Sequence, residues 1–177
     1  MARLIVIRHC KATGQEREAT LTQEGYEQAQ QLVHFLEHFP IHRVISSPFT
    51  RAIETITPYV NKQGLQIKID DRLQERVLST ENMDDWMEKL QQTYINYDLK
   101  FNGGESSNEA MSRVYEVINE IGVEETVAIV THGNLMSLLL HKITPTFGFQ
   151  EWAQLSNPDV YILENKNGQF HVERFWK

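Results

Sequence analysis

The sequence predicts an α/β fold, a three-layer sandwich in which a largely parallel central sheet is flanked by helices. Two observations lead to it. Short apolar runs alternate along the chain with segments whose apolar residues recur every three or four positions, as in buried strands and amphipathic helices. The chain has 177 residues, enough to bury a core within one domain. We therefore expect a single domain over residues 1–177, with the weakly patterned residues 71–105 as a variable segment near the functional site.

The N-terminal half is expected to alternate strands with helices. Thr22 is a favourable N-cap, and the apolar positions after it recur as on one face of a helix. Pro58 either kinks the second helix or ends it early, and Gly64 follows that helix. The expected elements are a strand at 3–8, a helix at 22–39, a strand at 43–47, a helix at 49–63 and a strand at 66–70.

The C-terminal half continues this alternation and ends in a hairpin. TVAIVTHG at residues 126–133 is the best strand candidate, and a helical segment follows it directly. Near the C-terminus, KNGQ separates two apolar segments, a pattern typical of a β-hairpin. The expected elements are helices at 82–97 and 106–121, a strand at 126–133, a helix at 134–143 and hairpin strands at 159–165 and 170–176.

Charge and cysteine content exclude several classes of function. The formal net charge of −7 argues against a nucleic-acid or anionic-membrane partner, because such proteins usually present a positive surface. Cys10 is the only cysteine in the sequence, which excludes an internal disulfide and a thiolate metal cluster and fits a reducing compartment. No apolar run is long enough for a signal peptide or a membrane span. We expect a cytoplasmic protein of unknown oligomeric state.

Polar and charged residues follow the predicted strands, and the carboxyl ends of parallel strands meet at the edge where ligands bind. We expect Arg8, His9, Arg51 and His132 to converge there, with Glu75 after the third strand. Guanidinium groups donate paired hydrogen bonds to phosphate oxygens and stay charged. A neutral imidazole nitrogen can attack phosphorus near pH 7. The pattern therefore favours phosphoryl-transfer chemistry on a small phosphorylated substrate.

Six short blocks follow one another along the chain. They are RHC at 8–10, LTQEGYEQA at 21–29, SSPFTRAIET at 46–55, LQE at 73–75, GES at 104–106 and THG at 131–133. Each block alone is weak evidence, but the ordered set resembles the motifs of the histidine phosphatase superfamily. The resemblance implies the phosphoglycerate-mutase-like fold and, for this chain, a small phosphatase.

The resemblance also implies a role for each residue of the predicted pocket. His9 would be the nucleophile that forms a phosphohistidine, and Glu75 would protonate the leaving oxygen and then activate water. The phosphoryl oxygens would be held by Arg8, Arg51 and His132. No metal and no other cofactor is implied. The activity implied is a metal-independent phosphomonoesterase.

Two residues near His9 raise further possibilities. Gln15 lies six residues after His9, where mutase-like members place a phosphate-contacting Asn, so it is a further phosphate-binding candidate. Cys10 could itself be a nucleophile, as in phosphatases with a C-x5-R loop. Six residues separate Cys10 from Arg17, so that register is wrong by one, and we disfavour this interpretation.

Two other functions stay open. The first is a phosphate-binding or regulatory protein with little turnover, an interpretation that relies on Cys10 in place of the family's glycine and on the unusual residues 76–82. The second is a phosphoglycerate mutase, which the short chain disfavours.

Glu81 is a rival to Glu75 as the acid. Four aromatic residues of the variable segment 71–105 could line a substrate pocket, although their helical spacing favours a core position. They are Trp86, Tyr94, Tyr97 and Phe101.

Overall fold

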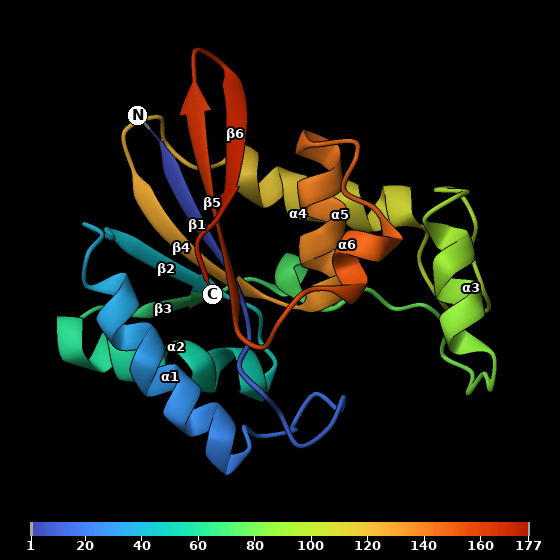
Figure 1. The fold of residues 1–177 in the computed structure, drawn as a ribbon, viewed down its shortest axis with the longest axis horizontal. Coiled ribbons are helices and arrows are strands. Elements are labelled where there is room, and N and C mark those ends of the chain that lie inside the picture. The colour runs from blue at the N-terminus through green and yellow to red at the C-terminus, as the bar shows by residue number, and fades with distance from the viewer. Residues whose placement is uncertain (1, 177) are drawn as a thin grey trace.

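A six-stranded sheet runs through the computed structural model, which describes residues 2–176 (Figure 1). The strands are β1 (Arg3–Arg8), β2 (Arg43–Ser46), β3 (Ile67–Ile69), β4 (Thr126–Thr131), β5 (Asp159–Lys166) and β6 (Gln169–Arg174). They lie in the order β3-β2-β4-β1-β5-β6. Strands β1 to β4 pair in parallel, whereas β5 runs antiparallel to β1 and forms a hairpin with β6. The predicted largely parallel sheet is confirmed.

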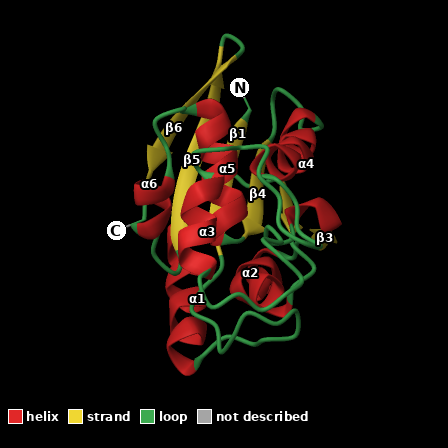
Figure 2. Ribbon diagram, turned by 90° about the vertical axis from the view of Figure 1, so that its right-hand side faces the viewer, coloured by secondary structure: helices red, strands yellow, loops and turns green. Residues whose placement is uncertain are grey.

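Helices cover both faces of this sheet, as Figures 1 and 2 show. They are α1 (Gln23–Leu36), α2 (Thr50–Gln63), α3 (Trp86–Thr93), α4 (Ser107–Asn119), α5 (Gly133–Ile143) and α6 (Phe149–Ala153), with a short 3-10 helix at Asp71–Leu73. Helices α1 and α2 pack on one face, and α4 and α5 pack on the other. In Figure 1, α3 lies farther from the sheet than the other helices. The three-layer sandwich is therefore confirmed.

The apolar core has two halves because successive strand residues point to opposite faces of the sheet. Ile5 and Ile7 of β1 pack among side chains of α1 and α2. Leu4 and Val6 pack among side chains of α4 and α5. Every residue of β4 is buried, as expected for a central parallel strand that is covered on both faces. The predicted apolar runs are thus explained by burial on both sides.

Most predicted elements occur, with differences at their ends. Thr22 caps α1 as predicted, accepting a hydrogen bond of 3.0 Å from the Gly25 N–H. Helix α2 continues through Pro58, because burial of its apolar face against the sheet outweighs the missing N–H donor. The strand predicted over 126–133 ends at Thr131, since His132 already leaves the strand to begin α5.

The variable segment differs most from the prediction. The helix expected over 82–97 is shortened to α3, which buries only Leu90 and Thr93 and so has little packing to extend it. Helix α6 and the 3-10 helix were not predicted because elements of five and three residues are too short to show a period.

Among the described residues, none of the helices is both long and apolar enough to cross a membrane.

Candidate active site

The carboxyl ends of β1, β2 and β4 bring the predicted residues together. Arg8 is the last residue of β1, and His9 follows it. Arg51 lies in the first turn of α2, which begins after β2, and His132 is the N-cap of α5, which follows β4. The rings of His9 and His132 are 5.2 Å apart between centroids. The predicted convergence at one sheet edge is therefore found.

His9 is held so that one ring nitrogen is defined as the donor. Its Nδ1 lies 2.7 Å from the carbonyl oxygen of Cys10, which can only accept a hydrogen bond. Nδ1 therefore carries the proton, and Nε2 carries the lone pair. The side chain is buried, and this burial, together with the nearby guanidinium groups of Arg51 and Arg8, lowers its pKa to about 3. His9 is thus a neutral imidazole at physiological pH.

Arg51 points at that lone pair. Its Nε donates to His9 Nε2 at 3.2 Å, and its Nη1 donates to the backbone carbonyls of Gln15 and Glu16 at 3.2 and 2.8 Å. The guanidinium group also lies 5.0 Å from the centre of the Phe49 ring. Arg51 is only 1% exposed, so these contacts fix a buried cation next to the imidazole.

His132 faces the same place from the carboxyl end of the neighbouring strand β4. Its Nε2 lies 2.8 Å from the hydroxyl oxygen of Ser47, which also accepts from the Phe49 N–H. Burial lowers the pKa of His132 well below its usual value, and the neighbouring His9 and Arg51 lower it further. Its Nδ1 is buried and has no hydrogen-bond partner within residues 2–176.

Arg8 is the second arginine of the site, beside Arg51. Its Nη1 donates to the carbonyl oxygen of Leu155 at 3.1 Å, while its buried Nε has no partner in the described part of the chain. A Cβ atom on Gly133 would lie 2.8 Å from this Nε. The glycine of the THG block is therefore needed because the arginine side chain passes directly over its backbone.

Glu75 is held by the start of α5. Its Oε1 accepts hydrogen bonds from the backbone N–H groups of Leu135 at 2.9 Å and Arg76 at 2.8 Å, and its Oε2 accepts one from Asn134 at 3.1 Å. Arg113 supports the backbone of this segment by donating to the carbonyl oxygens of Gln74 and Glu75. Oε2 has the smaller number of partners and is the atom better placed to meet a ligand.

The loop after His9 is fastened to α1. The N–H of Lys11 donates to the side chain of Gln28 at 2.9 Å. A Cβ atom on Gly25 would lie 2.1 Å from the Lys11 carbonyl oxygen, so only glycine allows the helix this close. These contacts explain the LTQEGYEQA block, whose residues Gly25 and Gln28 hold the loop after His9 against α1.

Cys10 is turned away from the site. Its side chain is fully buried in an apolar cluster with Leu21 and Ala29. Burial raises the pKa of its thiol to about 12, so the thiol stays protonated at neutral pH. This environment argues against a cysteine nucleophile, and it shows that the side chain beside His9 fills the core rather than the site.

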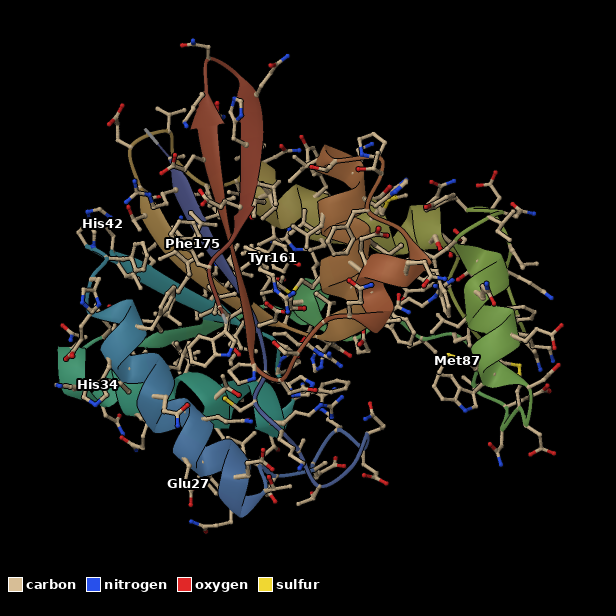
Figure 3. All side chains as sticks on the ribbon, in the orientation of Figure 1. Glu27, His34, His42, Met87, Tyr161 and Phe175 are labelled. Atoms are coloured by element: carbon tan, nitrogen blue, oxygen red, sulfur yellow. The ribbon has the colours of Figure 1, made fainter. Side chains whose placement is uncertain are left out.

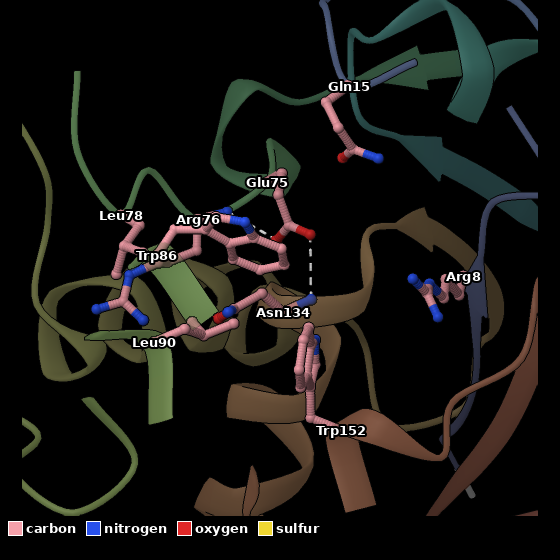
Figure 4. Close-up of a pocket in the computed structure, with 9 residues that line it drawn as sticks. All are labelled: Arg8, Gln15, Glu75, Arg76, Leu78, Trp86, Leu90, Asn134 and Trp152. Carbon is pink, nitrogen blue, oxygen red and sulfur yellow. Dashed lines mark hydrogen bonds between the residues drawn. The ribbon is translucent and has the colours of Figure 1, made fainter. Parts of the chain in front are cut away.

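A pocket of about 450 Å³ opens next to these residues (Figure 4). Arg8, Gln15 and Glu75 line its polar part. Trp86 also lines it and is 48% exposed, so the core position favoured for this residue was wrong: the first turn of α3 faces the pocket and not the core. Tyr94, in contrast, is buried in the core as expected.

The other histidines and the carboxylates form no second centre in the described chain. His34 lies on α1 and His42 directly precedes β2, both away from α3 and from the strand ends that carry the site (Figure 3). Within residues 2–176, no group of three or more His, Cys, Asp or Glu side chains is placed to hold a metal ion.

Sequence reasoning missed several residues of the site, among them three that follow the THG block. Asn157 donates to the backbone carbonyl of His9 at 2.9 Å, and Asn134 and Trp152 line the pocket. Asn134 directly follows the THG block, which was the one available signal. Asn157 and Trp152 belong to the segment after residue 133, where no block was found, and only the fold brings them to β1.

Comparison with known proteins bears on the family. The family model of the histidine phosphatase superfamily (branch 1) matches residues 4–177. No curated protein sequence matches the chain. Several solved structures do match, as follows.

The native structure of a mycobacterial glucosyl-3-phosphoglycerate phosphatase superposes with a TM-score of 0.80 at 20% identity, covering 98% of this chain and 97% of that one. YhfR of Bacillus stearothermophilus superposes with a TM-score of 0.80 at 22% identity, covering 98% and 96%. Phosphoserine phosphatase of Entamoeba histolytica, in complex with 3-phosphoglyceric acid, superposes with a TM-score of 0.81 at 16% identity, covering 100% and 98%. At these identities the likeness shows a shared fold.

Proposed function

Since the chain belongs to the histidine phosphatase superfamily, we propose that it is a metal-independent phosphomonoesterase that carries the phosphoryl group on His9. The observation that supports this best is the hydrogen bond from His9 Nδ1 to the Cys10 carbonyl oxygen. It leaves the Nε2 lone pair directed toward the guanidinium group of Arg51, on the side of His9 where the phosphate is expected to bind. A nucleophile needs a neutral nitrogen, and burial keeps this ring neutral.

The phosphoryl oxygens would be held by three side chains. Arg8 Nε and His132 Nδ1 are buried polar atoms without a partner in residues 2–176, and a phosphate oxygen would satisfy each. We place the proton of neutral His132 on Nδ1, with the Ser47 hydroxyl donating to Nε2. Arg51 supplies a further cation beside the point of attack. Charge neutralisation and positioning of this kind are the main requirements of phosphoryl transfer.

In the first step, the Nε2 lone pair of His9 forms a bond to phosphorus as the ester P–O bond breaks. The protonated carboxyl group of Glu75 gives its proton to the leaving oxygen, and an alcohol departs. Glu75 is then a carboxylate, the form that its three backbone N–H contacts suit.

In the second step, a water oxygen attacks phosphorus and the N–P bond electrons return to Nε2. Glu75 takes the proton from this water, inorganic phosphate is released, and both residues regain their starting forms. Gln15 lines the same pocket and is a further candidate to contact the phosphoryl group.

The test is to measure hydrolysis of p-nitrophenyl phosphate and to trap the phosphoenzyme. A phosphohistidine should be labile in acid and stable in base, and His9→Ala should abolish both turnover and trapping while circular dichroism stays unchanged. Cys10→Ser serves as the matched control, because its side chain lies outside the site. If Cys10→Ser lost activity as completely as His9→Ala, the assignment of the nucleophile would be wrong.

A further inference from the structure

The far end of the active-site pocket is apolar. Leu78, Trp86 and Leu90 line it, from the loop before α3 and from α3 itself. Trp152 of α6 also lines the pocket and lies between these residues and Arg8 (Figure 4). Figure 4 shows Arg8 at one side of the pocket and Leu78 with Leu90 at the opposite side, with Glu75 between them. A group attached to the phosphate and reaching past Glu75 would therefore meet hydrocarbon and indole surface.

The two tryptophans differ in how they are supported. The Trp152 ring packs on Phe149 at 5.4 Å and on Tyr94 at 6.5 Å between ring centres, so it is a fixed wall. Trp86 is 48% exposed, and no ring contact is found for it in residues 2–176. Exposed large apolar side chains that lie together beside polar residues indicate a ligand-binding surface.

This apolar surface extends beyond the pocket. A neighbouring depression shares Arg8 and Trp152 with it and adds Met87 and Phe149. Met87 is 45% exposed on α3 (Figure 3). The pocket volume of about 450 Å³ itself lies within the roughly 300–1,000 Å³ typical of small-ligand sites. It is therefore large enough for a phosphate ester that carries a ring.

The far end lacks a cation that could receive a second anionic group. Arg76 is the lining cation nearest to it, but this guanidinium is 6% exposed and donates to the Glu105 carbonyl oxygen and to the Thr93 hydroxyl. Arg8, the other cation among the described lining residues, belongs to the phosphate end. A carboxylate on the leaving group would be desolvated there without a charged partner, which is unfavourable.

We propose that this end of the pocket is a subsite for an uncharged, ring-bearing leaving group, packed between Trp86 and Trp152. The substrates would be phosphate monoesters of aromatic or other flat apolar alcohols, and not of carboxylate-bearing alcohols such as glycerate or serine. The inference rests on the proposed phosphatase function, since it assigns the leaving-group end of the same pocket.

The test uses two phosphonates, whose P–C bond cannot be hydrolysed, so that binding is measured apart from turnover. The probes are 2-phenylethylphosphonate and 2-carboxyethylphosphonate, which have the same spacer, and calorimetry gives their affinities. The phenyl compound should bind about tenfold more tightly, the magnitude expected when one aromatic ring is buried against another.

Trp86→Ala should remove most of this tenfold preference and leave the affinity for the carboxyethyl compound unchanged. Ile95→Ala is the matched control, since Ile95 is 80% exposed and lies just after α3 outside the pocket. Equal or tighter binding of the carboxyethyl compound, or an unchanged preference in Trp86→Ala, would overturn the proposal. So would a failure of both phosphonates to bind.

The outcomes also separate the subsite from the proposed function. Tighter binding of the phenyl compound without hydrolysis of p-nitrophenyl phosphate would support the subsite and contradict the phosphatase function. Hydrolysis through an acid-labile phosphoenzyme without a preference for the phenyl compound would support the phosphatase function and contradict the subsite.

Discussion

The side-chain amide of Asn157 donates a hydrogen bond of 2.9 Å to the backbone carbonyl of His9, a residue 148 positions earlier in the chain. The peptide groups around His9 are held on other sides as well. The His9 N–H donates to the Thr131 carbonyl oxygen at 3.1 Å, and the Cys10 N–H donates to the Thr55 hydroxyl at 2.9 Å. The imidazole therefore projects from a backbone that three separate segments fix, which is the kind of support that positions a nucleophile.

Asn157→Ala should lower kcat by roughly tenfold with little change in KM, because one hydrogen bond that positions the nucleophile is lost. Steady-state kinetics with p-nitrophenyl phosphate measures this. Asn108→Ala removes an exposed amide from α4 and is the control, expected to behave as the unchanged protein. An unaltered kcat in Asn157→Ala would show that this contact does not position His9.

Glu75→Gln should slow the hydrolysis of an alkyl phosphate by ~10²–10⁴, the usual value of general acid catalysis. p-Nitrophenolate leaves readily without a proton, so hydrolysis of p-nitrophenyl phosphate should slow far less. Comparing kcat for the two substrates measures the difference. The control is Glu81→Gln, which alters the rival acid: Glu81 is exposed, accepts a hydrogen bond from Asn102 and is not among the described residues that line the pocket. Equal losses on both substrates would remove Glu75 from proton transfer.

Prolonged treatment with EDTA should leave phosphatase activity intact, because the proposed site neutralises the phosphate with arginine and histidine side chains. Vanadate should inhibit competitively by occupying the site of Arg8, Arg51 and His132. Assays before and after chelation, with and without vanadate, check both expectations. Loss of activity in EDTA that Mg²⁺ or Zn²⁺ restores would contradict the metal-free mechanism.

The buried histidines should make the fold sensitive to acid. Burial, and then nearby Arg51 and Arg8, lower the pKa of His9 from 6.5 to about 3. Between these two values the unfolded chain binds a proton that the folded chain does not, so the free energy of unfolding falls as the pH falls. The contribution of His9 to this slope is about 1.4 kcal/mol per pH unit.

Urea unfolding between pH 4 and pH 7.5 measures this slope. His9→Gln should reduce it, whereas His34→Gln, which changes a side chain that is 79% exposed, should not. Identical slopes in all three proteins would show that His9 is not buried in its neutral form.

The pattern of the sequence was sufficient for the architecture and for which residues follow the parallel strands. Burial on both faces makes parallel strands apolar throughout, so β1 and β4 were visible as runs, and the residues at their carboxyl ends followed from topology. The ordered blocks gave Glu75 its expected role in proton transfer, which its place after the third strand alone did not indicate.

Tertiary structure alone decided what surrounds those residues. The direction of the Cys10 side chain, the contact of Asn157 with His9 and the exposure of Trp86 all depend on which segments pack together. Such contacts join residues far apart in sequence and leave no local period, because their energies come from packing and not from local backbone preference. The sequence by itself therefore determined which groups meet at the sheet edge. The fold decided which ring nitrogen carries the lone pair and which surface a leaving group would meet.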